Sequence, residues 1–140
     1  MPKITPFLWF DGRAEEAMTF YTSVFKNSKL GQITRYGEAG PGPAETVMSA
    51  TFELDGQAFI ALNGGPQFQF SPAISFFVNC ETQQEVDELW EKLSAGGDKL
   101  QCGWLRDRFG VSWQIVPAAL GAMLHDPDPA RSQRVMKAML

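Results

Sequence analysis

The stretch AISFFVNCETQQEVDELWEKLSAGG, residues 73–97, contains the pattern that decides the fold. Residues 73–80 are apolar and rich in aromatic side chains, which predicts a β-strand. Thr82 and Glu85 have the spacing of a capping box, in which the two side chains satisfy free backbone N–H groups at the start of a helix. The apolar residues that follow share one helical face: Val86, Leu89, Trp90 and Leu93. A Gly-Gly pair at 96–97 is typical of a helix end.

The N-terminal part of the chain begins with the same order of elements. Residues 3–10 predict a strand, and Asp11 is expected to cap a helix over 13–25. The apolar face of that helix would consist of Ala14, Ala17, Met18, Tyr21 and Phe25.

Each predicted helix is followed by three short strands. In the N-terminal half these are 29–36, 47–54 and 57–62. In the C-terminal half they are 99–101, 103–106 and 111–116. A Gly-Pro loop at 37–44, an Asp55-Gly56 hairpin turn and a turn at 108–110 would connect strands in the two halves.

The order of one strand, one helix and three strands occurs twice, which indicates an internal βαβββ repeat. One helix per three or four strands favours an α+β fold in which helices cover one face of each sheet. We place the modules at 1–65 and 66–117 within a single 140-residue domain, with the linking segment at 63–72. A helical extension would follow over 118–140, and its apolar stripe would dock either on its own domain or on a neighbouring subunit.

Composition excludes several classes of function. The chain is 44% hydrophobic and 20% charged, as in packed globular proteins. Its net charge is −4 and its basic residues are scattered, so we expect no nucleic-acid partner. No segment has the length of a membrane span or the form of a signal peptide, so we expect a cytoplasmic protein.

Cys80 and Cys102 are interpreted as buried or half-buried free thiols.

The run WLRDRFGVSWQIVP, residues 104–117, is the most specific of several family motifs. The others are ITPFLWF at 4–10, AEEA at 14–17, FY at 20–21, RYG at 35–37, GPGP at 40–43, ALNGG at 61–65 and ISFFV at 74–78. Together they cover nearly the whole chain and resemble the PhnB-like branch of the vicinal-oxygen-chelate superfamily, which includes glyoxalases, bleomycin-resistance proteins and dioxygenases. Members of this branch often carry a demethylubiquinone methyltransferase-like description. The chain has no Gly-rich turn between a strand and a helix for a nucleoside cofactor, so methyl transfer has no support in its sequence.

The resemblance implies a concave cavity formed by paired modules. In the superfamily's metalloenzymes, His and Glu side chains of the inner strands hold a divalent ion that stabilises a developing anion on the substrate. The matching positions fall near Pro6, Ile60, Ala73 and Gln114. Three of these have no donor atom, and the neutral amide of Gln114 is a poor replacement for a carboxylate. We therefore expect no metal and no other cofactor, and we interpret His125, the only histidine, as a polar loop residue.

No other pattern indicates catalysis. Ser75, Ser112 and Thr51 have no histidine placed to act as a base. Cys80 precedes the second helix, but strand alternation assigns it to the helix-packed core. The acidic residues fall mostly on helix faces, where they would be solvated.

Strand alternation predicts which residues face the cavity. Leu8 and Phe10 would do so in the first strand, and Trp104 would lie at the rim or cover the module junction. The candidate ligand-binding residues are Phe10, Ser75, Phe77, Asn79, Trp104 and Gln114. An ordinary protein core can contain the same mixture of apolar and polar residues, so these side chains could instead form part of such a core.

Three functions follow from the resemblance together with the missing metal ligands. The first is metal-independent binding of a small organic molecule by a homodimer, as in the antibiotic-sequestering members of the superfamily. The second is a lyase or isomerase of the glyoxalase or dioxygenase type with a non-standard site. The third is a structural or interaction dimer. Modules that pair within one chain and modules swapped between chains remain equally open.

Overall fold

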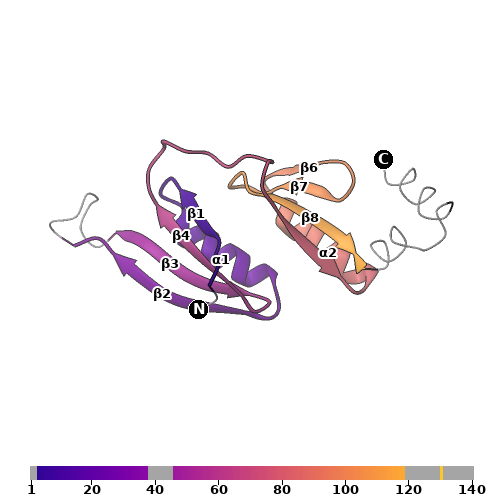
Figure 1. Cartoon of the computed structure of the whole chain (residues 1–140), viewed down its shortest axis with the longest axis horizontal. Coiled ribbons are helices and arrows are strands. Elements are labelled where there is room, and N and C mark those ends of the chain that lie inside the picture. The colour runs from indigo at the N-terminus through magenta and orange to yellow at the C-terminus, as the bar shows by residue number, and fades with distance from the viewer. Residues whose placement is uncertain (1–2, 38–45, 119–129, 131–140) are drawn as a thin grey trace. The chain divides into compact units, whose positions relative to one another are not determined.

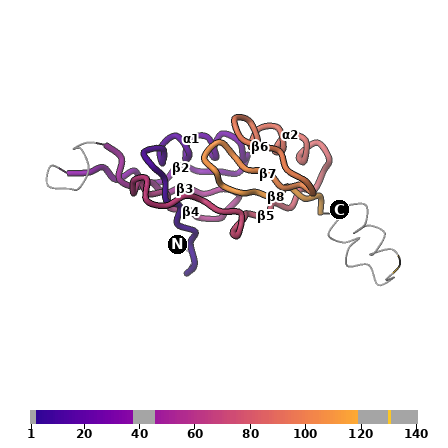
Figure 2. Tube along the Cα trace, turned by 90° about the horizontal axis from the view of Figure 1, so that it is seen from above, coloured from indigo at the N-terminus to yellow at the C-terminus, as the bar shows by residue number. Residues whose placement is uncertain are grey.

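The computed structural model describes residues 3–37 and 46–118, together with Ala130. The chain forms two compact units, Met1–Phe70 and Ser71–Leu140. Each unit contains a four-stranded sheet, and a helix lies on one side of that sheet (Figures 1 and 2). The expected α+β fold with a repeated module is confirmed. None of the helices in the described part of the chain is long and apolar enough to cross a membrane.

The first unit has the strand order β1-β4-β3-β2. Its elements are β1 (Phe7–Phe10), α1 (Ala14–Val24), β2 (Ser28–Arg35), β3 (Val47–Leu54) and β4 (Gln57–Asn63). β1 runs parallel to β4, and the other pairs are antiparallel. Asp55 and Gly56 join β3 to β4 with φ angles of 49° and 81°. Positive φ at both residues is the geometry of a type I′ hairpin turn, so this turn was correctly predicted.

The core of the first unit lies between α1 and its sheet. The buried helix residues are Ala14, Ala17, Met18, Tyr21 and Val24. Tyr21 stacks on Phe52 of β3, which in turn stacks on Phe59 of β4 with ring centroids 5.3 Å apart. This aromatic layer joins the helix to the two central strands of the sheet.

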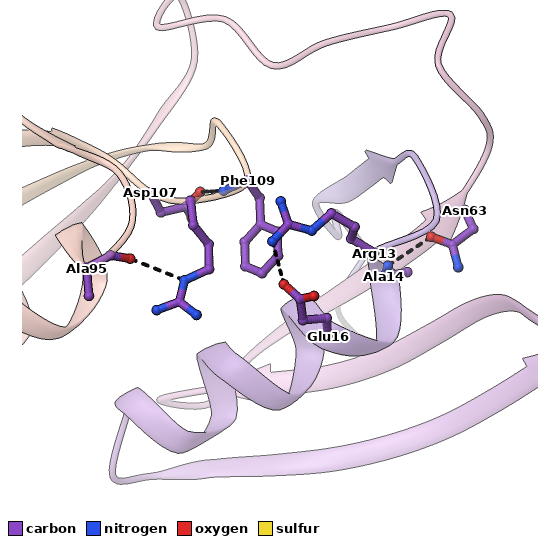
Figure 3. Close-up of polar contacts among 8 residues, drawn as sticks. Arg13, Ala14, Glu16, Asn63, Ala95, Asp107 and Phe109 are labelled. Carbon is purple, nitrogen blue, oxygen red and sulfur yellow. Dashed lines mark hydrogen bonds and ion pairs between the residues drawn. The ribbon is translucent and has the colours of Figure 1, made fainter.

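The start of α1 differs from the prediction that Asp11 caps it. Arg13 occupies the N-cap position, and its side chain makes no capping hydrogen bond. The backbone N–H of Ala14 donates instead to Oδ1 of Asn63 at 2.8 Å, as Figure 3 shows. Asn63 also donates through Nδ2 to the carbonyl of Val47 at 3.0 Å. A single β4 side chain therefore ties the helix start to two strands, which no local sequence signal reveals.

The second unit has the strand order β5-β8-β7-β6. Its elements are β5 (Ser75–Cys80), α2 (Gln83–Ser94), β6 (Asp98–Lys99), β7 (Trp104–Arg106) and β8 (Ser112–Pro117). β5 runs parallel to β8, whereas β7 runs antiparallel to both β8 and β6. Thr82 caps α2, because its hydroxyl accepts a hydrogen bond from the backbone N–H of Glu85 at 3.1 Å. This cap was correctly predicted.

The turn between β7 and β8 is organised by a buried carboxylate. Oδ1 of Asp107 accepts hydrogen bonds from the backbone N–H groups of Phe109, at 2.8 Å (Figure 3), and Val111, at 3.0 Å. Its Oδ2 accepts from the indole of Trp113 at 2.9 Å. Gly110 completes the turn with φ of 91°. Asp107 therefore fixes both the turn and the first residues of β8.

The predicted loop at 37–44, His125 and the predicted helical extension at 118–140 lie outside the described residues, apart from Gly37, Ala118 and Ala130.

Candidate functional site

The second sheet has one face beneath α2 and one face directed away from it. The helix contacts β5, β7 and β8. The buried apolar side chains between helix and sheet include Leu89, Leu93, Leu105, Trp113 and Ile115. Because neighbouring strand residues point to opposite faces, the residues that alternate with them in β7 and β8 point away from the helix. We call this surface the α2-distal face.

Three side chains of the α2-distal face form one row across the sheet. Phe77 of β5 pairs with Gln114 of β8, and Gln114 pairs on its other side with Trp104 of β7. Phe77 is 54% exposed, whereas Gln114 and Trp104 are half-buried. We call these three residues the aromatic row. Its backbones span about 10 Å, because neighbouring strands lie roughly 4.8 Å apart.

A hydrogen bond orients the amide at the centre of the row. Nε2 of Gln114 donates to Oγ of Ser75 at 2.9 Å. Ser75 lies two residues before Phe77 in β5, so the bond links the aromatic row to the next row of the sheet. The amide nitrogen is thereby directed toward Ser75.

The next row carries the charges of this face. Ser75 pairs with Ser112, which pairs with Arg106 of β7, and Arg106 pairs with Asp98 of β6. Arg106 donates to Oδ2 of Asp98 through Nε at 3.2 Å and through Nη2 at 2.9 Å. This geometry places a neutralised ion pair beside the polar end of the aromatic row.

The α2-distal face brings together five of the six candidate residues. They are Ser75, Phe77, Asn79, Trp104 and Gln114. Asn79 is exposed and lies at the level of Val116, one step beyond Phe77 on this face.

Phe10 is placed elsewhere, and the expectation that it faces a cavity is wrong. Phe10 is only 3% exposed and Leu8 only 6%, so both belong to the core of the first unit. The ring of Phe10 packs edge-on against Phe70, with centroids 5.3 Å apart. The side chains of β1 that point away from the core are Phe7, 57% exposed, and half-buried Trp9.

Trp9 is held in place by the chain that follows β4. Its indole N–H donates to the carbonyl of Gly65 at 2.9 Å, and its ring meets Phe68 edge-on at 5.0 Å. A Cβ atom at Gly64 would lie 2.4 Å from the indole ring, so only glycine allows this contact. The close packing explains Gly64 of the ALNGG motif, and Gly65 has a φ angle of 101°, which favours glycine.

The residues at the positions that hold a metal in the superfamily do not fit a divalent ion. Pro6, Ile60 and Ala73 offer no donor, and Gln114 offers only a neutral amide whose nitrogen is engaged with Ser75. Within residues 3–37 and 46–118, no three His, Cys, Asp or Glu side chains gather where they could hold a metal ion. Transition metals prefer imidazole, thiolate and carboxylate ligands. The side chains at these four positions therefore do not form a ligand set for a divalent metal.

Cys80 is a core residue, as predicted. It is fully buried, and burial is the main cause that raises the pKa of its thiol to about 12. A hydrogen bond with Glu85 and the charge of that carboxylate raise the pKa further. A thiol with this pKa remains protonated at neutral pH and is a weak nucleophile. Cys102 is half-buried, and neither cysteine forms a disulfide bond.

Comparison with known proteins gives consistent results for the family and the fold. The family model described as 3-demethylubiquinone-9 3-methyltransferase matches residues 2–116. The solved structure of a putative 3-demethylubiquinone-9 3-methyltransferase, PhnB protein, from Bacillus cereus is 46% identical, covers 84% of this chain and 100% of that chain, and has a TM-score of 0.77. None of the curated proteins matches the chain.

Two more distant structures share the fold alone. Protein PA1353 from Pseudomonas aeruginosa is 24% identical over 84% of this chain and 98% of that chain, with a TM-score of 0.69. A glyoxylase/bleomycin resistance protein/dioxygenase domain from Frankia sp. EAN1pec is 17% identical over 81% and 94% of the two chains, with a TM-score of 0.51. The two sheets and two helices thus match the glyoxalase/bleomycin-resistance-like fold.

Proposed function

The chain belongs to the PhnB-like 3-demethylubiquinone-9 3-methyltransferase family of the vicinal-oxygen-chelate superfamily, and from this premise we propose that it binds a small organic molecule without a metal ion. The proposed site is the α2-distal face of the second sheet. Five of the candidate residues identified in the sequence would take part: Ser75, Phe77, Asn79, Trp104 and Gln114.

The observation that carries this proposal is the aromatic row. A large aromatic side chain, Phe77, is 54% exposed beside the half-buried Gln114 and Trp104. Small-molecule sites combine apolar and aromatic walls with a few oriented polar groups. The amide of Gln114, oriented by Ser75, supplies such a group. Large apolar side chains that stay exposed often mark a surface that binds another molecule. The exposure of Phe77 therefore supports a ligand-binding role for this face.

The chemistry of the available donors favours binding without a metal. The four positions that would supply ligands contain Pro6, Ile60, Ala73 and Gln114. These side chains cannot replace the imidazole and carboxylate ligands of a metal-dependent relative. Methyl transfer is not part of the proposal, because the sequence lacks the Gly-rich turn of a nucleoside-cofactor site.

Native mass spectrometry of the gently purified full chain, with metal analysis of the same sample, tests the proposal. We expect a metal-free protein that retains or captures a small organic molecule, with the same occupancy in EDTA. Stoichiometric divalent metal, together with loss of the organic ligand when the metal is removed, would contradict it. The same spectrum reads the oligomeric state and so tests the proposed homodimer.

A pair of variants locates the binding surface. Phe77→Ala should weaken capture of the ligand, because it removes the exposed ring of the aromatic row. Ile74→Ala is the matched control, because Ile74 is 75% exposed and lies just before β5. Equal weakening by both variants would place the ligand elsewhere.

A further inference from the structure

The arrangement of the aromatic row restricts the shape of a ligand. Phe77 and Trp104 lie on the strands to either side of Gln114, at the same level of the sheet. A ring placed over the Gln114 amide would therefore have an aromatic side chain on each side. Flat rings gain most from such a position, because aromatic pairs favour offset-stacked or edge-to-face contact.

The central amide restricts the polar group of the ligand. Nε2 of Gln114 is engaged with Oγ of Ser75 at 2.9 Å. Within the described residues, Oε1 of Gln114 accepts no hydrogen bond. A carbonyl oxygen is an acceptor only, so the group that it binds must carry an O–H or N–H.

The charges of the face restrict the ligand further. The charged side chains that β6 and β7 contribute to this face are Asp98 and Arg106, and they form an ion pair of 2.9 Å. Arg106 is therefore already neutralised. An anionic ligand would therefore find no uncompensated positive charge on β6 or β7, and Oε1 of Gln114, which is an acceptor only, would disfavour its negative charge.

We infer that the ligand is a flat, neutral aromatic molecule with a hydroxyl or N–H donor, bound with its ring against Phe77 and Trp104 and its donor on Oε1 of Gln114. This inference rests on the proposed function and names the chemical class that the same site takes. The inference rests on three observations: the position of Gln114 between Phe77 and Trp104, the hydrogen bond from Gln114 to Ser75, and the ion pair of Arg106 with Asp98.

Four naphthalene compounds separate these requirements. Naphthalen-2-ol is flat, neutral and a donor; 2-methoxynaphthalene lacks the donor; naphthalene-2-carboxylate is anionic; decahydronaphthalen-2-ol keeps the donor but is not flat. Each is titrated into the ¹⁵N-labelled full chain in EDTA, and the side-chain amide of Gln114 and the indole N–H of Trp104 are followed by NMR. Naphthalen-2-ol should shift both signals and bind about fivefold or more tightly than the methoxy compound, the ratio expected for one hydrogen bond.

Variants at the central position test the role of its oxygen. Gln114→Met keeps the length of the side chain but removes the acceptor, so the preference for the hydroxyl over the methoxy compound should disappear. Gln114→Glu keeps an acceptor and should retain that preference. Gln101→Met, at an exposed position of the same unit, is the matched control and should leave the preference unchanged.

The outcomes distinguish this inference from the function on which it rests. Equal affinity for the hydroxyl and methoxy compounds, or a preference that survives in Gln114→Met, overturns the inference. If the carboxylate or the decahydro compound shifts both signals and naphthalen-2-ol does not, the chemical class is wrong and small-molecule binding stands. If none of the four compounds and no member of a fragment library shifts either signal, the proposed function fails together with the inference.

Discussion

The indole N–H of Trp113 donates a 2.9 Å hydrogen bond to the carboxylate of Asp107, and both residues are only 2% exposed. The same carboxylate accepts the backbone N–H groups of Phe109 and Val111. Trp113 precedes Gln114 in β8, so this bond also fixes the strand that presents the central residue of the aromatic row. Asp107 therefore supports the candidate site from the opposite side of the sheet.

Replacing Asp107 by Asn should destabilise the second unit by about 2–3 kcal/mol, because the amide can accept fewer of the three hydrogen bonds that the carboxylate accepts. Urea unfolding followed by tryptophan fluorescence measures this change. Asp98→Asn is the control, because an exposed ion pair contributes at most about 1 kcal/mol. Equal effects of the two substitutions would show that the buried carboxylate has no special role.

Replacing Asn63 by Ala should lower the free energy of unfolding of the first unit by about 1–2 kcal/mol. The variant loses the cap on Ala14 and the bond to the carbonyl of Val47. Asp11→Ala should change stability by less than about 0.5 kcal/mol, as for an ordinary surface residue. Thermal unfolding measures both changes. A larger loss of stability in Asp11→Ala than in Asn63→Ala would show that Asp11 caps α1.

Replacing Gly64 by Ala should displace the indole of Trp9, because the new Cβ would lie 2.4 Å from the ring. We expect a loss of about 1–3 kcal/mol, as for overpacking in other proteins. The indole N–H signal of Trp9 should shift in the NMR spectrum, because its bond to Gly65 is disturbed. Gly37→Ala is the control, since among the described residues no atom beyond its chain neighbours lies within 4 Å of a Cβ built there. An unshifted Trp9 signal in Gly64→Ala would contradict the packing.

The raised pKa of Cys80, about 12, predicts a distinct pH dependence. The folded state holds the thiol proton more tightly than the unfolded state, whose thiol titrates near its ordinary pKa of 9.0. Stability should therefore be unaffected by this group below about pH 9 and fall as the pH rises from there toward 12. The fall should be smaller in Cys80→Ala, measured by urea unfolding at several pH values. An identical fall in the variant would assign the effect to other groups.

The local parts of the fold follow from the sequence because their causes are local. The Asp55-Gly56 turn, the Thr82 cap and the end of α2 near Gly96 each depend on residues within one turn of chain. The sequence of β1, in contrast, does not show which of its side chains face the core. The strand reads Phe-Leu-Trp-Phe from 7 to 10, so no alternation of polar and apolar residues sets its phase.

The features that the sequence did not reveal depend on contacts between distant residues. Asn63 caps a helix 49 residues earlier in the chain, and Trp9 bonds to Gly65, 56 residues later. The candidate site is an intermediate case. Alternation predicts that Ser75 and Gln114 share a face with Phe77 and Asn79, but only the register of β5, β8 and β7 places Phe77, Gln114 and Trp104 in one row.

The most direct test of the central claim is an NMR titration of the metal-free full chain in EDTA with a small organic ligand, following the side chains of the aromatic row. Metal-independent binding predicts saturable shifts of the Gln114 amide and the Trp104 indole N–H, and their loss or weakening in Phe77→Ala but not in Ile74→Ala. Binding that needs an added divalent ion, or saturable binding that leaves both signals unmoved, would contradict the account.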